Sequence, residues 1–383
     1  MIAVIADDLT GAAELAAIAH RHGLTAEVRL EAGSSSGLEF VALDSHSRGG
    51  SAAESISRVD SVVRQLLAQR PEFIYKKVDS VLRGHVLVEL ETIMTMTGRS
   101  RAILVPVNPT LGRVIKAGHY LIHGQPIHET DFRHDPHYPR LSSDVLTLLG
   151  GARTLPVEIC PVGGPLPERG IVVGEAQTPQ DLRRWAERLD DGALAAGGAE
   201  FFAATLQHRG YSPTASGGLP PAAPTGKSLF ICGSASSSTQ EFVRQAAHLG
   251  VPVFSLVNES ERGEMPANGQ SVLLQRVLRA FNAANRVVLA TGPKIPLPPG
   301  GAAELTSRLV ELAAATLAAQ PVARIYVEGG ATARALMDHL GWRRLRVVEE
   351  LALGVASLQN LAVASPILSM KPGSYLWPAE LLG

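Results

Sequence analysis

The feature that most constrains the fold is a repeated alternation of short apolar runs with longer helical patterns. The run "IAVIA" at residues 2–6 precedes Leu15, Ile18 and Ala19, which recur at helical spacing. The second half repeats this order with "SLFICG", "VPVFSL", "RVVLAT", "RIYVEG" and "LRVVEEL" as its apolar runs. Strands that alternate with helices predict α/β domains, each with a mostly parallel sheet that helices cover on both faces.

The length of the chain and one unusual segment predict two domains. The 383 residues are enough for about two domains of ordinary size. Residues 211–226, "YSPTASGGLPPAAPTG", combine proline, glycine and small polar residues without an apolar period, which is typical of a linker. We therefore predict an N-terminal domain at 1–210, a linker at 211–227 and a C-terminal domain at 228–383.

Composition excludes several classes of function. The formal net charge is -1 and charged residues make up 19% of the chain, so nothing indicates a nucleic acid or a membrane surface as partner. No apolar run approaches the ~20 residues that span a bilayer, and "MIAVIADDLT" lacks the basic start of a signal peptide. Cys160 and Cys232 are the only cysteines, too few for a disulfide framework or a zinc cluster. We expect a cytoplasmic protein.

Candidate binding residues follow the apolar runs, because ligands of such sheets bind beyond the carboxyl ends of the strands. Asp7 and Asp8 follow the first run directly, and adjacent carboxylates are costly unless positive groups or hydroxyls meet them. "YKKVDSVLRGH" places Lys77, Asp79 and Arg83 after a second run. Lysine and arginine so close together suit a carboxylate or a phosphate. The alternative is a solvated loop with an Asp79–Arg83 salt bridge.

Three turns in the second half suggest an anion site. "ICGSASSSTQEF" places Ser234 and Ser236 at the start of a helix, where backbone N–H groups attract anions. "RIYVEGGATARAL" repeats this order with Gly329 and Gly330, and "MKPGSYLWP" contributes Lys371 and Gly373. The alternatives are ordinary helix capping and tight glycine turns. Together the three turns favour a nucleotide site.

Two other motifs resemble phosphate or metal sites only in part. "TGKSLFIC" is not a phosphate-binding P-loop, because Pro221 stands where that motif needs glycine and the strand follows the motif. Residues 105–145 are predicted to form one long polar loop in which Arg113, Gly118 and His119 line a substrate cleft. We predict no metal site there, because the spacing of its histidines fits no zinc motif. These histidines are His119, His123, His128, His134 and His137.

Seven motifs together resemble the four-carbon acid sugar kinase family. They are, in order, "IADDLTGAAE", "KKVDSVLRGH", "VNPTLGRVIKAGHY", "ETDFRHDP", "GSASSSTQ", "GGATA" and "KPGSY", and they cover nearly the whole chain. The resemblance implies an N-terminal domain that binds a four-carbon sugar acid such as threonate, erythronate or an oxo-tetronate. It also implies a C-terminal domain that binds ATP, and phosphoryl transfer across a cleft between the two. Mg²⁺ is expected to enter with ATP.

The resemblance also implies roles for individual residues. Asp8 is predicted to orient or deprotonate the attacking hydroxyl, with Asp79 as the second choice, and both are predicted together with Arg83 to act in catalysis. The sugar acid would be held by Asp7, Arg48, Lys77, Arg113 and His119. The nucleotide would be held by Ser234, Ser236, Gly329, Gly330, Ala331, Thr332, Lys371 and Gly373.

The sequence departs from the family pattern at Glu14, where the family usually has aspartate, and at Ala331, where it has an acid. The alternative function is therefore a catalytically silent member that senses a sugar acid or a nucleotide. An NAD-dependent dehydrogenase would need a GxGxxG motif after an early strand, which this chain lacks. The sequence leaves open which sugar acid is used and whether the protein is a homodimer.

Overall fold

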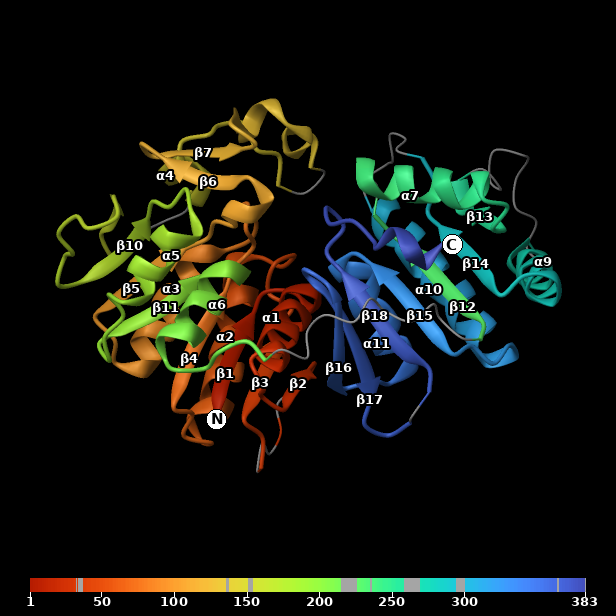
Figure 1. The fold of residues 1–383 in the computed structure, drawn as a ribbon, viewed down its shortest axis with the longest axis horizontal. Coiled ribbons are helices and arrows are strands. Elements are labelled where there is room, and N and C mark those ends of the chain that lie inside the picture. Colours follow the sequence, from red (N-terminus) through yellow and green to blue (C-terminus); the bar gives the residue numbers. More distant parts are fainter. Residues whose placement is uncertain are drawn as a thin grey trace. The chain divides into compact units, whose positions relative to one another are not determined.

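The computed structural model describes all residues except 32, 34–36, 136–137, 151–153, 215–225, 235, 258–268, 294–299, 364 and 383. It divides into two compact units, Met1–Ala215 and Ser216–Gly383, which we call the N-terminal unit and the C-terminal unit (Figure 1). This division falls inside the predicted linker at 211–227, most of which lies outside the described residues.

The N-terminal unit is built on a parallel sheet with the strand order β2-β3-β1-β4-β11-β5-β10-β9. Strands such as β1 are buried along their whole length, as expected for a parallel sheet with helices on both faces. The strands are β1 (Ile2–Ala6), β2 (Ala26–Arg29), β3 (Phe40–Asp44), β4 (Phe73–Lys77), β5 (Arg101–Val105), β9 (Val157–Cys160), β10 (Gly170–Gly174) and β11 (Ala193–Gly197).

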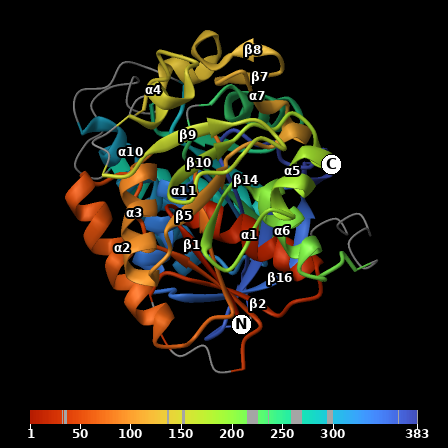
Figure 2. The same cartoon turned by 90° about the vertical axis from the view of Figure 1, so that its left-hand side faces the viewer.

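Helices cover both faces of this sheet. Helices α2 and α3 lie side by side on one face, and α1, α5 and α6 lie on the other (Figure 2). Capping side chains determine where two of these helices begin. Asp8 caps α1 by accepting from the Gly11 N–H, and Ser51 and Glu54 form a capping box at α2. The helices are α1 (Leu9–Arg21), α2 (Ala52–Leu67), α3 (Val86–Thr97), α5 (Pro179–Ala186) and α6 (Ala199–His208).

The prediction of one long polar loop at 105–145 is wrong. The segment contains a small antiparallel sheet in the order β6-β7-β8. Gly118 and Gly124 adopt positive φ angles of 77° and 82° and let the chain reverse between these strands, so Ile115 and Tyr120 become fully buried. Its elements are η1 (Pro109–Leu111), β6 (Arg113–Lys116), β7 (His119–Ile122), β8 (Gln125–Pro126), η2 (Ile127–Glu129), η3 (Asp131–His134) and α4 (Val145–Leu149).

The C-terminal unit has the strand order β13-β14-β12-β15-β18-β17-β16. Strands β13 to β18 in this order are parallel, and β17 and β16 add an antiparallel edge. The predicted mostly parallel α/β architecture is therefore confirmed in both units. The strands are β12 (Ser228–Cys232), β13 (Val253–Ser255), β14 (Arg286–Ala290), β15 (Arg324–Glu328), β16 (Arg344–Ala352), β17 (Val355–Asn360) and β18 (Ile367–Lys371).

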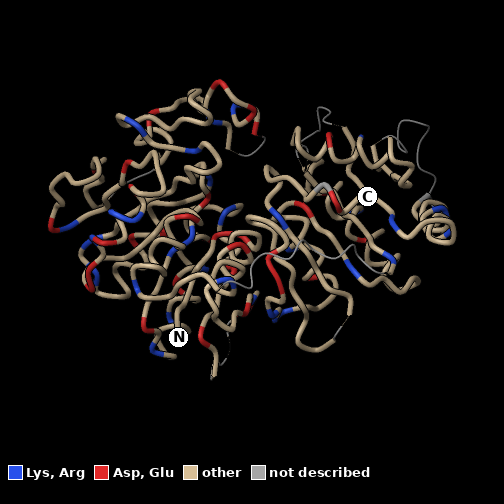
Figure 3. The backbone as a smooth tube through the Cα atoms, viewed as in Figure 1, with Lys and Arg blue, Asp and Glu red and all other residues tan. Residues whose placement is uncertain are grey.

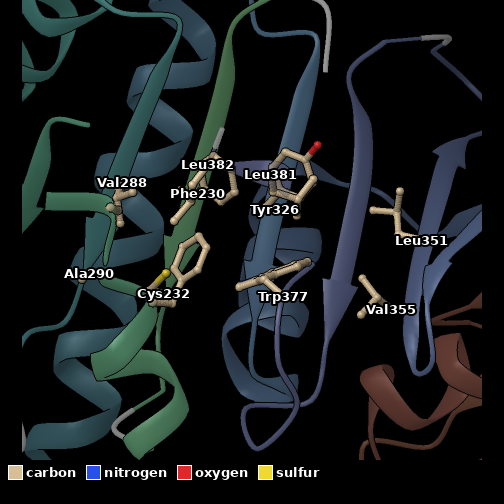
Figure 4. Packing of buried hydrophobic residues seen from close by; sticks show 12 residues of the cluster. Phe230, Cys232, Val288, Ala290, Tyr326, Leu351, Val355, Trp377, Leu381 and Leu382 are labelled. Atoms are coloured by element: carbon tan, nitrogen blue, oxygen red, sulfur yellow. The ribbon is translucent and has the colours of Figure 1, made fainter. Parts of the chain in front are cut away.

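An aromatic cluster forms part of the core of the C-terminal unit (Figure 4). The rings of Phe230 and Tyr326 stack with their centroids 4.5 Å apart, and Trp377 meets Tyr326 edge-on at 5.6 Å. The segment after β18 thus covers one face of the sheet. The described helices of this unit are α7 (Ser237–His248), α9 (Gly269–Ala283), α10 (Gly301–Ala319), α11 (Gly330–Leu340) and η4 (Ala379–Leu381).

Each sheet contains a point where neighbouring strands send their connections in opposite directions. In the N-terminal unit these neighbours are β1 and β4, and in the C-terminal unit they are β12 and β15. Ligands of open α/β sheets bind in the crevice outside the carboxyl ends of such strands.

Acidic and basic residues are interspersed along both units (Figure 3). Among the helices of the described residues, none has the length and apolar character needed to cross a membrane.

Candidate functional site

The two adjacent aspartates meet an arginine at the carboxyl ends of β1 and β3. Arg48 donates from Nε to Asp7 Oδ2 at 2.7 Å and from Nη1 to Asp8 Oδ2 at 2.7 Å. The second oxygen of Asp8 accepts from the Gly11 N–H at 2.8 Å. The guanidinium of Arg48 therefore compensates the repulsion between the two carboxylates.

A second acid–arginine pair follows β4. Arg83 donates to Asp79 in a bidentate fork, with Nε 2.9 Å from Oδ2 and Nη2 2.8 Å from Oδ1, and its Nη1 donates to Asp135 Oδ2 at 3.0 Å. Arg48 Nη2 lies 3.7 Å from Asp79 Oδ1, so the two pairs form one cluster. The cluster sits at the β1/β4 crevice, where the topology predicts a ligand site.

Lys77 enters this cluster from the end of β4. Its ammonium donates to the Val78 carbonyl at 3.0 Å and lies 3.4 Å from Glu14 Oε2. A Cβ added to Gly11 would lie 2.8 Å from Asp8 Oδ1 and 3.3 Å from Lys77 Nζ. Glycine at position 11 is therefore what lets the lysine side chain lie so close to the start of α1.

The buried charges shift the pKa values of the aspartates in different directions. Burial, with the charge of Asp8, raises the pKa of Asp7 although Arg48 opposes this. Burial alone would also raise the pKa of Asp8 and Asp79, but nearby cations outweigh it. Arg48 and Lys77 lower the pKa of Asp8, and Arg83 and Arg48 hold that of Asp79 well below its usual range. Asp8 and Asp79 are thus ionised acceptors at neutral pH.

Two further residues predicted to bind substrate lie at different distances from this cluster. Arg113 is buried and donates from Nη1 to Ser80 Oγ at 2.6 Å, next to Asp79 in the chain. His119 is exposed on β7, and its Nδ1 lies 3.1 Å from Ser143 Oγ. The structure therefore brings Arg113 to the edge of the cluster, whereas the contact of His119 lies elsewhere and its role stays a prediction.

Sequence reasoning missed two residues that contact the cluster from the segment after η3. Asp135 accepts from Arg83, and the Tyr138 hydroxyl donates to the Arg48 carbonyl oxygen. The available signal was the motif "ETDFRHDP", whose last aspartate is Asp135. His137 lies outside the described residues, and among those described no three His, Cys, Asp or Glu side chains gather as a metal site.

In the C-terminal unit, the turns after β12 and β18 contact each other. Ser236 caps α7 and donates from Oγ to the Gly373 carbonyl at 2.7 Å, and Ser238 Oγ donates to the same oxygen at 2.9 Å. The Ser236 N–H donates to Ser234 Oγ at 3.2 Å. A Cβ on Gly373 would lie 2.6 Å from Ser234 Oγ, so the close approach requires glycine.

The turn after β15 lies against both of these turns. Gly329 has a φ of 94° and donates its N–H to the Lys371 carbonyl at 3.1 Å, while a Cβ on Gly233 would lie 1.9 Å from the buried Thr332 Oγ1. Within the described residues, no side chain caps α11, which begins at Gly330. The N–H groups of its first turn can therefore bind an anion. Ala331 is exposed in that turn.

Lys371 is buried beside these turns, and its ammonium lies 3.4 Å from the Pro372 carbonyl oxygen. Its side chain is 1% exposed and its ammonium lies 3.1 Å from Glu328 Oε2, at the ends of neighbouring strands. The predicted contact of this lysine with a nucleotide is untested and stays a prediction.

Two protein-family models match the chain. The model of a sugar-binding N-terminal domain matches residues 2–205, and the model of a nucleotide-binding C-terminal domain matches residues 229–375. Solved structures share the fold over the whole chain. A Salmonella typhimurium protein described as a candidate tRNA synthase superposes with a TM-score of 0.77 at 20% identity over 100% of this chain and 97% of its own. A Haemophilus influenzae protein does so with a TM-score of 0.70 at 19% identity, covering 99% and 98% of the two chains. At such low identity this likeness concerns the fold alone.

Curated relatives carry kinase names. A D-threonate kinase from Bordetella bronchiseptica is 32% identical over 40% of each chain. A D-threonate kinase from Cupriavidus necator is 29% identical over 92% of this chain and 88% of its own, and a 3-oxo-tetronate kinase from Methylobacterium radiotolerans is 24% identical over 97% and 95%. Other alignments are shorter: those with a D-erythronate kinase from Heliobacterium modesticaldum, the Bordetella bronchiseptica enzyme and a D-threonate kinase from Salmonella typhimurium span only 33%, 40% and 37% of these relatives' own lengths. With both domain models matched in order, the chain belongs to the four-carbon acid sugar kinase family.

Proposed function

We propose that this protein is an ATP-dependent kinase that phosphorylates a hydroxyl of a four-carbon sugar acid of the threonate, erythronate or oxo-tetronate class. The observation that carries the proposal is the cluster of Asp7, Asp8 and Asp79 with Arg48 and Arg83 at the β1/β4 crevice. Carboxylates accept from sugar hydroxyls, and guanidinium groups bind carboxylates and phosphates. The names of the relatives support the same class of substrate.

The chemistry asks this cluster mainly for positioning and charge compensation. The substrate hydroxyl attacks the terminal phosphorus of ATP, the bond from that phosphorus to ADP breaks, and the hydroxyl proton passes through Asp8 to solvent. The lowered pKa of Asp8 makes it an ionised acceptor that orients the hydroxyl. Arg83 or Lys77 is the proposed partner of the sugar carboxylate.

The turns of the C-terminal unit fit the phosphates of a nucleotide. Gly329, with its positive φ and no side chain, would let a phosphate approach the backbone closely. Helix α11 offers first-turn N–H groups that no described side chain caps. Ser234 and Ser236 add hydroxyls beside these turns. When bound, Mg²⁺ neutralises phosphate charge, and it is proposed to enter with the nucleotide.

A kinase assay tests the proposal. The protein is mixed with ATP, Mg²⁺ and, one at a time, D-threonate, D-erythronate and a 3-oxo-tetronate, and ADP release is measured. Turnover of at least one of these substrates is expected.

The second candidate function is a sensor without catalysis, which the exposed Ala331 in place of the family's acid favours. Calorimetry separates the two candidates. If a tetronate binds but none of the three sugar acids causes release of ADP from ATP, the kinase is rejected and the sensor is supported.

A further inference from the structure

A buried carboxylate links the three turns of the C-terminal unit. Glu328 ends β15, and the strand register places it between Cys232 of β12 and Lys371 of β18. Its side chain is 0% exposed, lies 3.1 Å from Lys371 Nζ through Oε2, and accepts from the Thr239 hydroxyl through Oε1.

Glu328 and its two partners lie next to three different turns. Thr239 lies in the first turn of α7, Glu328 immediately precedes Gly329, and Lys371 is followed by Pro372 and Gly373. The Gly329 N–H also donates to the Lys371 carbonyl at 3.1 Å. One carboxylate therefore connects the three segments that carry the candidate phosphate contacts.

The surroundings of Glu328 contain few charges. Lys371 of β18 and Cys232 of β12 are the titratable groups that face it among the described residues, and the Trp377 indole also lies against the pair. The Lys371 ammonium is 5.2 Å from the centre of the Trp377 ring, which belongs to the aromatic cluster of Figure 4.

Stability does not explain why such a pair is buried here. Taking two charges out of water costs about as much as their attraction returns, and apolar replacements of both partners are often neutral or stabilising. We propose that Glu328 is a positioning residue of the nucleotide site, which holds the turns after β12, β15 and β18 in the arrangement that binds phosphate. This inference rests on the proposed nucleotide-binding function of the C-terminal unit.

The same geometry makes the positioning depend on pH. Burial raises the pKa of Glu328 to about 7, because it outweighs the opposing charge of Lys371, and burial also lowers the pKa of Lys371. The ion pair therefore forms fully only above neutral pH. If the ionised form alone binds ATP, about one tenth of the protein is competent at pH 6, and the Kd is roughly tenfold larger at pH 6 than at pH 8.

Calorimetry with Mg²⁺ and ATP at pH 6, 7 and 8 tests this inference on the full chain. The Kd of the wild type is expected to fall about tenfold from pH 6 to pH 8. Glu328→Gln cannot ionise, so its Kd at pH 8 is expected to be at least about tenfold larger than that of the wild type. The ratio of the two proteins at each pH cancels the titration of ATP itself.

Glu349→Gln provides a matched control. Glu349 of β16 lies with its Oε1 2.7 Å from Nη1 of Arg324. Arg324 begins strand β15, which Glu328 ends. Loss of an ion pair there is expected to leave the Kd of ATP and its pH profile unchanged.

A second variant keeps the test decisive if Glu328→Gln does not fold. Glu328→Met with Lys371→Met removes both buried charges and is expected to fold, with weak binding of ATP that lacks the additional pH step. Wild-type affinity and an unchanged pH profile in either folded variant would overturn the inference. If the wild type binds ATP with a Kd that does not fall from pH 6 to pH 8, the positioning role of Glu328 is overturned but the nucleotide site stands. If the wild type does not bind ATP, both the positioning role and the nucleotide site are rejected.

Discussion

Both units bury a lysine–glutamate pair at the end of a strand beside the candidate site, yet the two pairs differ in their electrostatics. In the N-terminal unit, Lys76 Nζ lies 2.5 Å from Glu89 Oε2, and the pKa of Glu89 is lowered. In the C-terminal unit, Lys371 Nζ lies 3.1 Å from Glu328 Oε2, and the pKa of Glu328 is raised to about 7.

The balance between burial and the surrounding donors differs at the two carboxylates. Burial alone would raise the pKa of both acids. At Glu89, Lys76 and the hydroxyls of Ser47 and Ser55 together outweigh burial, and Ser55 Oγ donates at 2.8 Å. At Glu328, burial outweighs the charge of Lys371 and the hydrogen bonds from Lys371 and Trp377. A buried carboxylate thus stays ionised at low pH only where its donors and cations outweigh burial.

The two candidate sites differ in the same sense. The N-terminal unit gathers charged side chains, among them Asp8 and Asp79, whose pKa values neighbouring cations lower, whereas the C-terminal unit offers glycine turns, hydroxyls and helix N–H groups. The charges of Asp8 and Asp79 at the first site are therefore expected to be constant near neutral pH, and geometry at the second site is expected to respond to one titrating group.

The largest effect is expected at the first site. Asp8→Asn should lower kcat about 100-fold to 10,000-fold, because the amide is a poor acceptor for the attacking hydroxyl. Steady-state kinetics measure this, and circular dichroism checks the fold. The matched control Asp60→Asn alters a partly exposed aspartate on α2 that pairs with Arg64. A kcat for Asp8→Asn within twofold of that control would remove Asp8 from the mechanism.

The second effect concerns the buried pair of the N-terminal unit. Glu89→Gln leaves the Lys76 charge without its anion and should lower the free energy of unfolding by about 3–5 kcal/mol, measured by urea denaturation. Lys76→Met combined with Glu89→Leu should recover most of this loss. Because the pKa of Glu89 is lowered, its ionised form stabilises the fold at pH values above the ordinary 4.5, and this stabilisation is lost only as the pH falls below that value. The contribution of Glu89 to the stability of the wild type should therefore be constant from pH 6 to pH 8. A loss below 1 kcal/mol in Glu89→Gln would contradict this account.

Arg83→Lys tests the anion-binding role of a guanidinium. Lysine cannot reproduce the fork on Asp79 while also contacting Asp135, so kcat/KM should fall by roughly 2–4 kcal/mol of transition-state free energy. Arg64→Lys is the control, because Arg64 forms the same fork with Asp60 four residues earlier, with distances of 2.7 and 3.0 Å, on the solvent-facing side of α2. Equal kinetics of the two variants would make Arg83 a structural ion-pair partner.

The smallest effect is expected at the second site. ATP binding should tolerate Ala331, because glycine backbone and helix N–H groups supply the phosphate contacts. Ala331→Asp should tighten binding by about 1.5–3 kcal/mol, roughly tenfold to a hundredfold in Kd, if the added acid contacts ribose, base or Mg²⁺. Calorimetry with Mg²⁺ and ATP measures this. Absence of binding in both proteins, with the fold intact, would show that the C-terminal unit binds no nucleotide.

The sequence alone determined the architecture and much of the first site. Alternating apolar runs and helical patterns are local signals, and the residues after each run necessarily lie at the carboxyl edge of a parallel sheet. Asp7, Asp8, Lys77, Asp79 and Arg83 were found in this way, with Arg48 indicated by the family resemblance. The antiparallel sheet at 113–126 was missed, because its short strands lack a clear apolar period and depend on glycine turns and tertiary burial.

Only the tertiary structure decided which of these residues share a contact and which ions are buried. Asp135 reaches Arg83 across 52 residues of chain, and Glu328 meets Thr239 across 89. No local pattern encodes such separations, because they follow from the order of strands in each sheet. The contact of Lys371 with phosphate stays a prediction, whereas strand pairing reveals its contact with Glu328, which no sequence pattern indicates. Sequence spacing specifies where a side chain starts, whereas the packing of neighbouring strands specifies what it meets.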